Sequence, residues 1–207
     1  MAGRRAIIAL VCMILAVIGS GTTSQAAYVS TNPPAYDNVV SPDPASIGHV
    51  TLYNASGSEV VSGSLSDLGG ATYAVASNAA RTGATSARLL AAVPDSATSS
   101  GSWATGPLSA ATNFAVTAGT GIPTVVSSAS GPVATLNGTS DGDLAAFLNG
   151  VTLNSTSGYA GYLQLRVVDS GGSLAAATTW ATLEIAVDAA AGTWQQVFPV
   201  PDRKSVV

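Results

Sequence analysis

Tyr162-Leu163-Gln164-Leu165-Arg166-Val167-Val168 and Thr182-Leu183-Glu184-Ile185-Ala186-Val187 are the two stretches that decide the fold. Apolar side chains recur at every second position in both, which is typical of a β-strand with one buried face. Gln164, Arg166 and Glu184 fall on the opposite face. If the two strands pair antiparallel, Arg166 and Glu184 share a solvent-facing surface, where an ion pair adds well under about 1 kcal/mol. We therefore predict a pair of half-buried strands with a polar outer face.

The rest of the chain is divided into short apolar runs by clusters of Gly, Pro, Ser, Asn and Asp. Such spacing is typical of all-β domains. Only residues 143–148 are expected to form a short helix, capped by Asp141 or Asp143 and ended by Asn149-Gly150. The sequence therefore predicts an all-β fold, an antiparallel β-sandwich of about 8–10 strands. The expected strands are 50–53 with 59–62 as its hairpin partner, 71–76, 84–93, 111–117, 123–127, 133–136, 159–169, 178–188 and 193–200.

Residues 1–26 have the organisation of a secretory signal peptide. Arg4 and Arg5 precede an apolar stretch from Ala6 to Ile18, and Ser24-Gln25-Ala26 supplies small residues for cleavage. The apolar stretch is shorter than the roughly 20 residues that span a bilayer, so we expect cleavage and no membrane span in the mature chain. The predicted location is secreted or attached to the cell surface.

Four prolines in residues 27–46 favour an extended linker or arm before the folded part. Residues 47–201 are expected to form one β-sandwich domain. Two small β domains split near 118–122 are the alternative. Residues 202–207 break from the preceding composition and match the translation of a common short-read sequencing adapter. We expect this segment to be a sequencing artefact and the natural protein to continue past Pro201.

The charge balance excludes a nucleic-acid surface. The chain is 9% charged with a formal net charge of −4, and its only cysteine, Cys12, lies in the leader. Between the leader and the tail, three arginines (Arg81, Arg88 and Arg166) stand against ten carboxylates. No basic footprint for nucleic acid is present. We leave the partner open, with a cell-wall or extracellular glycan or a protein as the expected classes.

Catalytic chemistry has few candidates in the mature sequence. His49 is the only histidine, and no Gly-x-Ser-x-Gly elbow frames a serine. We predict no catalytic residues, no cofactor and no metal, and a secreted hydrolase is the most distant of the alternatives. Asp141 and Asp143 have the spacing of a calcium loop but lack its remaining ligands, so a helix-capping turn is the preferred interpretation.

Aromatic side chains are the candidate ligand-binding residues. Trp103, Trp180, Trp194 and Tyr162 would form a platform for sugar rings if several of them share an exposed face. Packing in the core of a sandwich is the competing interpretation. A carbohydrate-binding module is therefore the alternative to a purely structural or adhesive module.

Three segments carry a family resemblance. Val50–Gly57, the strand from Tyr162 to Arg166, and Gly192-Thr193-Trp194-Gln195-Gln196-Val197-Phe198-Pro199 resemble the N-terminal domain of secreted, Ig-like-repeat surface proteins of high-GC Gram-positive bacteria. The resemblance implies an immunoglobulin-like β-sandwich followed by further modules and, in some of these proteins, a wall anchor. It implies no catalytic residues.

Overall fold

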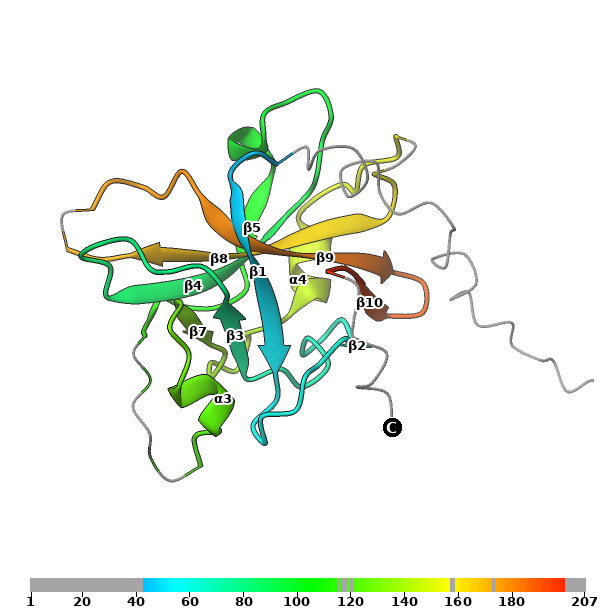
Figure 1. Cartoon of the computed structure of the whole chain (residues 1–207). Coiled ribbons are helices and arrows are strands. Elements are labelled where there is room, and N and C mark those ends of the chain that lie inside the picture. The colour runs from blue at the N-terminus through cyan, green and yellow to red at the C-terminus, as the bar shows by residue number, and fades with distance from the viewer. Residues whose placement is uncertain are drawn as a thin grey trace, which may run out of the picture.

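The computed structural model describes residues 43–199 apart from 115, 117, 118, 120, 157, 158 and 173 (Figure 1). Ten strands, two short helices and one 3-10 turn form an all-β fold, as predicted. The elements are β1 (Ser46–Tyr53), β2 (Ser62–Ser64), β3 (Tyr73–Ala76), β4 (Ser86–Ala92), η1 (Ser100–Ser102), β5 (Thr105–Pro107), β6 (Thr112–Asn113), α3 (Thr124–Ser127), β7 (Val133–Thr135), α4 (Leu144–Asn149), β8 (Tyr162–Ser170), β9 (Trp180–Asp188) and β10 (Thr193–Phe198).

Residues 162–168 lie in β8 and residues 182–187 lie in β9. These two strands pair antiparallel, with Leu165 opposite Leu183. β4 pairs antiparallel with the other edge of β8. The prediction of a wholly antiparallel fold is wrong, because the first half of β1 pairs parallel with β9. The sheet is therefore mixed, with the order β5-β4-β8-β9-β1-β3-β7.

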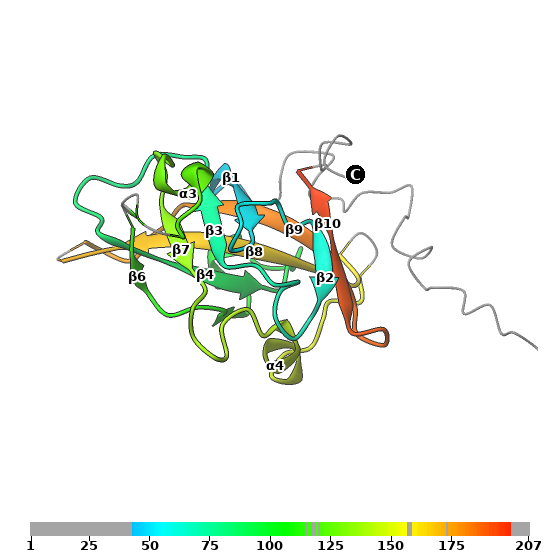
Figure 2. The same ribbon diagram turned by 90° about the horizontal axis from the view of Figure 1, so that it is seen from below.

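β1 connects two layers of strands. Its residues 46–49 pair with β9, and its residues 50–53 pair antiparallel with β3, which in turn pairs with β7. Figure 2 shows β1, β3 and β7 on one side of β4, β8 and β9. The inward side chains of both layers form one apolar core, in which Leu52, Leu89, Leu165, Leu183 and Ile185 are fully buried. Burial of each such side chain stabilises the folded state by about 1.5–3 kcal/mol.

α4 covers part of the core on the side away from β1 and α3 (Figure 2). Leu144 is buried in the main core, and Phe147 lies against β5 at Gly106. A Cβ at Gly106 would approach the Phe147 ring to 2.8 Å, so only glycine leaves room for this contact. The helix predicted at 143–148 is thus confirmed within one residue.

The strand prediction at 123–127 is wrong, because this segment forms α3. Pro123, in an extended conformation, precedes the helix, and the Pro123 carbonyl accepts hydrogen bonds from the amides of Val126 and Ser127. Val126 is buried against Tyr73 and Val133. These local hydrogen bonds provide partners for the backbone N–H and C=O groups, so the segment needs no neighbouring strand.

The predicted hairpin between 50–53 and 59–62 is reduced to a bridge between Tyr53 and Glu59. The next strand, β2, pairs with β10 instead. The short strand β5 was not predicted, because the sequence around it is rich in polar residues. β2 and β5 thus pair with strands that are not their neighbours in a short hairpin.

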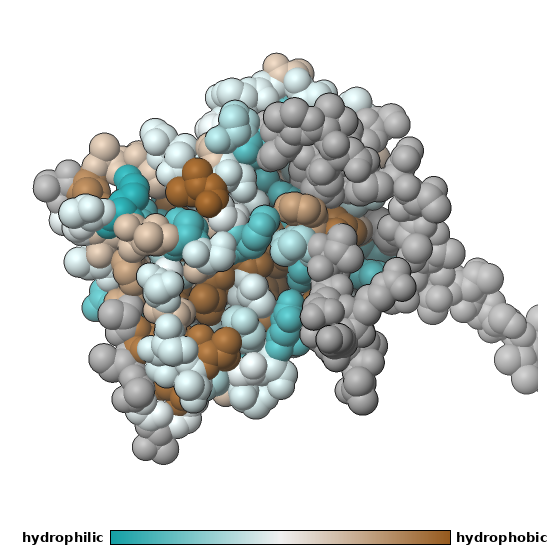
Figure 3. All heavy atoms as spheres, viewed as in Figure 1, coloured by the Kyte–Doolittle hydropathy of each residue, from teal (hydrophilic) through white to brown (hydrophobic). Residues whose placement is uncertain are grey.

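Strands from both sides of 118–122 pair directly, β1 with β9 and β4 with β8. Asp43 is buried and Ser46 begins β1, so the end of the expected linker belongs to the fold. Residues 1–26, the rest of the linker and 202–207 lie outside the described residues. Figure 3 shows apolar side chains interspersed with hydrophilic ones on the face that carries β1 and β3.

Candidate functional site

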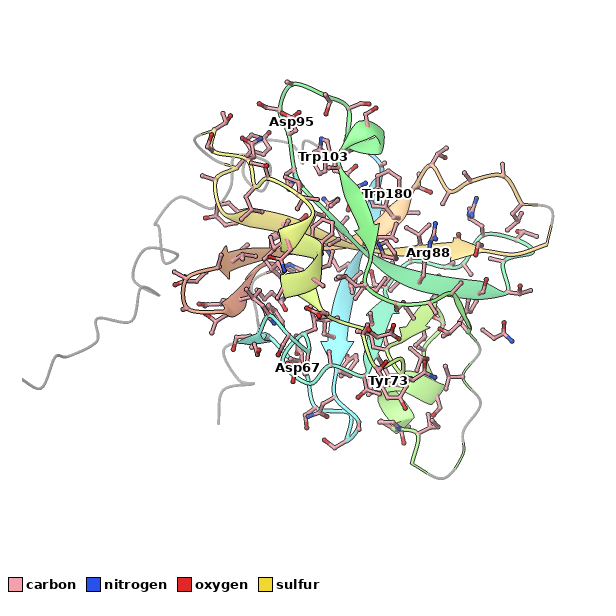
Figure 4. All side chains as sticks on the ribbon, turned by 180° about the vertical axis from the view of Figure 1, so that it is seen from behind. Asp67, Tyr73, Arg88, Asp95, Trp103 and Trp180 are labelled. Atoms are coloured by element: carbon pink, nitrogen blue, oxygen red, sulfur yellow. The ribbon has the colours of Figure 1, made fainter. Side chains whose placement is uncertain are left out.

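A buried guanidinium between two indole rings is the most distinctive feature of the molecule. Arg166 on β8 is 2% exposed. Its Cζ lies 4.1 Å from the centre of the Trp180 ring and 4.9 Å from that of Trp103. Figure 4 shows both tryptophans at the same end of the sheet. Cation–π contacts of this kind are strongest where water is excluded. We call Arg166, Trp103, Trp180, Asp43, Gln164 and Glu184 the arginine cluster.

Hydrogen bonds fix the orientation of the guanidinium. Arg166 Nε donates to Gln164 Oε1, and Nη1 donates to the carbonyl of Ser100 over 3.0 Å. Gln164 Nε2 in turn donates to Glu184 Oε1 over 3.2 Å. Gln164 and Glu184 are opposite each other on β8 and β9, so strand register alone brings them together.

Asp43 ties the beginning of the described chain to this cluster. Its Oδ2 accepts a hydrogen bond of 2.7 Å from Trp180 Nε1 and lies 3.5 Å from Arg166 Nη2. Its Oδ1 accepts from the amide of Ala45. The residue is 1% exposed, so both charges of the ion pair are removed from water. Removing one partner from such a pair is costly because the other charge is left buried.

Burial lowers the pKa of Arg166 to about 10, although the negative charges of Asp43 and Glu184 act in the opposite direction. The guanidinium is therefore still cationic at neutral pH. Desolvation outweighs the attraction of the neighbouring carboxylates.

The prediction that Gln164, Arg166 and Glu184 form a solvent-facing surface is wrong. All three lie on the predicted face of the strands, but their exposed fractions are 0%, 2% and 2%. η1, through Ser100, and Asp43 contact this face. Alternation along a strand predicts which face of the sheet a side chain lies on. It does not predict whether a loop from a distant part of the sequence covers that face.

The four aromatic candidates are buried, with exposed fractions of 4% for Trp103, 7% for Trp180, 2% for Trp194 and 7% for Tyr162. The structure brings only Trp103 and Trp180 together, and Arg166 lies against both rings. Trp194 belongs to the main core, and Tyr162 packs with Tyr159 and Ala186 in a separate cluster. The residues that the sequence interpretation missed as a site are Asp43, Gln164, Arg166 and Glu184.

A groove of about 230 Å³ adjoins the arginine cluster. We call it the arginine groove, because Arg81, Arg88 and Arg166 all line it. Arg81 is held by an ion pair of 2.5 Å with Asp169 and by hydrogen bonds to the carbonyls of Asp169 and Ala175. Arg88, labelled in Figure 4, is exposed. The remaining lining residues are Leu90, Gly101, Thr105, Val168, Asp169, Ser170, Leu174, Ala175, Ala176, Ala177 and Trp180.

A second cavity, of about 340 Å³, is lined by Trp103, Asp95 and Asn154 among others. The indole of Trp103 and the amide of Asn154 are hydrogen-bonded within the protein. Trp103 Nε1 donates to the carbonyl of Asp95 over 2.9 Å, and Asn154 Nδ2 donates to that of Pro94 over 3.0 Å. These bonds hold the loop after β4 in place.

Asp143 caps α4 by accepting from the amide of Ala146, as the sequence predicts, and Asp141 accepts from the amides of Asn137 and Gly138. His49 is exposed on β1, with its ring centre 5.6 Å from that of Phe198 and the two rings at 75°. Within the described ranges, no three His, Cys, Asp or Glu side chains are grouped closely enough to hold a metal ion. None of the helices in that part of the chain is long and apolar enough to cross a membrane.

Comparison with protein-family models, with curated proteins and with solved structures found no match.

Proposed function

We propose that this chain is a non-catalytic, immunoglobulin-like β module of a secreted or cell-surface bacterial protein, with a structural or adhesive role. The observation that carries the proposal is the arginine cluster, which joins Asp43, before the first strand, to β8 and β9. A module that spaces or displays other domains needs its entry segment held to the fold, and this cluster does so.

The use of the charged side chains supports a non-catalytic role. An acid or base must be positioned where it can reach a substrate proton. The carboxylates of Asp43 and Asp169 instead bind arginines and neighbouring amide or indole N–H groups. Glu184 is buried and accepts from Gln164. These groups stabilise the sheet.

The path of the two outer strands supports a role in a chain of modules. β1 pairs with β9 at Trp180–Thr182, and β10 pairs with the same edge of β9 from Asp188 to Glu184. The strands run toward each other and meet where His49 contacts Phe198. Entry and exit strands are thus both hydrogen-bonded to one central strand, so a force on either end is transmitted to the same element.

The export part of the proposal is tested by expressing the full chain with a C-terminal tag in a high-GC Gram-positive host. We expect a processed chain, beginning near Ala27, in the medium or wall fraction. The matched control replaces Leu10 and Leu15 in the apolar stretch by arginine, which should retain the chain in the cell. An unprocessed wild-type chain found only in the cytoplasm contradicts the proposal.

The non-catalytic part is tested on the same preparation with wall glycans as substrates. We expect no release of soluble sugar. Release that disappears in Asp169→Asn, with the melting temperature unchanged, would show that a carboxylate acts as a catalyst and would overturn this part.

A further inference from the structure

The arginine groove gathers every arginine of the described chain at one place on a protein with a formal charge of −4. Its three arginines come from different elements: Arg81 precedes β4, Arg88 lies on β4 and Arg166 on β8. Asp169 is the only acidic residue in the lining. The groove is therefore a cationic site on an acidic molecule, and such a site concentrates anions.

Arg88 is the cation that is free to bind. It is exposed on β4, directly opposite Val168, and it makes no hydrogen bond or ion pair with the residues that the structure describes. Arg81 differs, because Asp169 and Ala175 already accept its hydrogen bonds. A planar guanidinium presents paired donors that match the two oxygens of a carboxylate.

Arg166 also lines the groove, but the neighbouring carboxylates of Asp43 and Glu184 compensate its charge. Its side chain is 3% exposed, and its Nη2 lies 3.5 Å from Asp43 without forming a hydrogen bond. A buried donor that lacks an acceptor carries a desolvation cost that a nearby anion reduces. For Arg166 Nη2 that anion is the carboxylate of Asp43, so Arg88 is the arginine of the groove that is left for a ligand.

We propose that the arginine groove binds the carboxylate of a small ligand with an apolar body. Arg88 makes the direct contact with the carboxylate. The walls next to the charges are formed by apolar side chains, namely those of Leu90, Val168, Leu174, Ala175, Ala176 and Ala177.

The apolar walls favour an aliphatic ligand over a hydroxylated acid sugar. Thr105 and Ser170 are the only hydroxyl groups in the lining, and Ser170 Oγ already bonds to Ser86 Oγ over 2.9 Å. Sugar hydroxyls would therefore find few hydroxyl partners along the apolar part of the wall. At about 230 Å³, the groove is smaller than the roughly 300–1,000 Å³ of typical drug-sized sites. It fits a single residue or a short acid.

Four probes distinguish the sources of such a carboxylate. N-acetylvaline represents a peptide C-terminus, and 3-methylbutanoate carries the same branched body without the peptide group. N-acetylvalinamide removes the charge, and galacturonate adds hydroxyl groups. Each is titrated into the purified chain, and binding is followed by amide chemical shifts in the NMR spectrum.

We expect N-acetylvaline and 3-methylbutanoate to shift the amides of β4 and β8, and N-acetylvalinamide to bind at least tenfold more weakly than N-acetylvaline. Tighter binding of N-acetylvaline than of the simple acid supports a peptide C-terminus as the ligand. Equal binding supports a free short-chain acid. Galacturonate as the tightest ligand overturns the assignment of an apolar body.

Two variants that each lower the net charge by one, Arg88→Gln and Thr124→Glu, test whether Arg88 is the contact, and Arg88→Lys keeps the charge. Arg88→Gln should weaken N-acetylvaline at least tenfold, and Arg88→Lys should retain part of the affinity. Thr124→Glu, on α3 outside the groove, changes the net charge by the same amount and should leave the affinity within twofold. Equal losses in Arg88→Gln and Thr124→Glu, or no shifts on β4 and β8 at saturating probe, overturn the proposal. The test uses purified protein, so its outcome is independent of the export experiment.

Discussion

Trp180 Nε1 donates a hydrogen bond of 2.7 Å to Asp43 Oδ2, which joins two residues 137 positions apart in the chain. The same Asp43 oxygen lies 3.5 Å from Arg166 Nη2, and the Trp180 ring lies against that guanidinium. Three long-range contacts therefore meet at one point on the polar face of β8 and β9.

Trp180→Phe tests the hydrogen bond while keeping an aromatic ring beside Arg166. We expect a loss of about 1–3 kcal/mol in the free energy of unfolding, because buried Asp43 loses its indole donor. Trp194→Phe is the matched control. Trp194 is equally buried, and its Nε1 has no hydrogen-bond partner, so only the loss of volume remains. Urea denaturation of both variants gives the difference, and equal losses would contradict a role for the Asp43 bond.

Arg166→Met tests the buried cation. Its removal leaves Asp43 and Glu184 buried without a positive neighbour, and we expect a loss of about 3–5 kcal/mol. Arg88→Met, at an exposed position on the adjacent strand, should change stability by no more than about 0.5 kcal/mol. Chemical denaturation at neutral pH distinguishes the two, and comparable small changes would show that the cluster contributes little.

Tyr53 provides a pH-dependent prediction. Burial raises the pKa of Tyr53, and the negative charge of Glu59 raises it further. The folded state therefore keeps the phenol proton at a pH where the unfolded chain has lost it, and this contribution to stability falls as pH rises past about 10.

Glu59→Gln should lower the pKa of Tyr53 toward the ordinary value, as measured by the ultraviolet absorbance of phenolate against a Tyr53→Phe reference. Asp95→Asn, in the loop beside Trp103, removes an equal charge and should leave the Tyr53 titration unchanged. A Tyr53 titration that does not move in Glu59→Gln would exclude the charge effect.

Gly131 lies close to the backbone at the end of β3. A Cβ at this position would be 2.0 Å from the carbonyl oxygen of Ala76 and 2.6 Å from that of Asn78. Because both atoms belong to the backbone, Gly131→Ala should cost about 1–3 kcal/mol. At Gly101 no atom lies within 4 Å of the added Cβ, so Gly101→Ala should be neutral or slightly stabilising. Melting temperatures that fall equally would contradict the local packing.

Alternation was sufficient to predict β8 and β9, because Leu163, Leu165, Leu183 and Ile185 really do share the buried face. The cap of α4 was also predictable, since Asp143 and its bond to Ala146 are local in the sequence. These features depend on residues within a few positions of one another.

The arginine cluster was not predictable in the same way. Arg166 follows the alternation expected of an exposed residue, and its burial depends on Asp43, Ser100 and Trp103, none of which is near it in the chain. The sequence nonetheless carried a signal. The chain is poor in arginine, yet Arg166 lies on a central strand, and Gln164 and Glu184 lie beside it. Polar residues at adjacent register positions of two central strands are a signal for a covered polar layer.

A double-mutant cycle on Asp43→Asn and Arg166→Met tests most directly whether the entry segment is held to the sheet by this ion pair. The free energies of unfolding of the wild-type chain, both single variants and the double variant are measured in urea at neutral pH. We predict a coupling energy of about 1–3 kcal/mol, with the double variant less destabilised than the sum of the single variants. Losses that add to within about 0.3–0.5 kcal/mol would contradict the account.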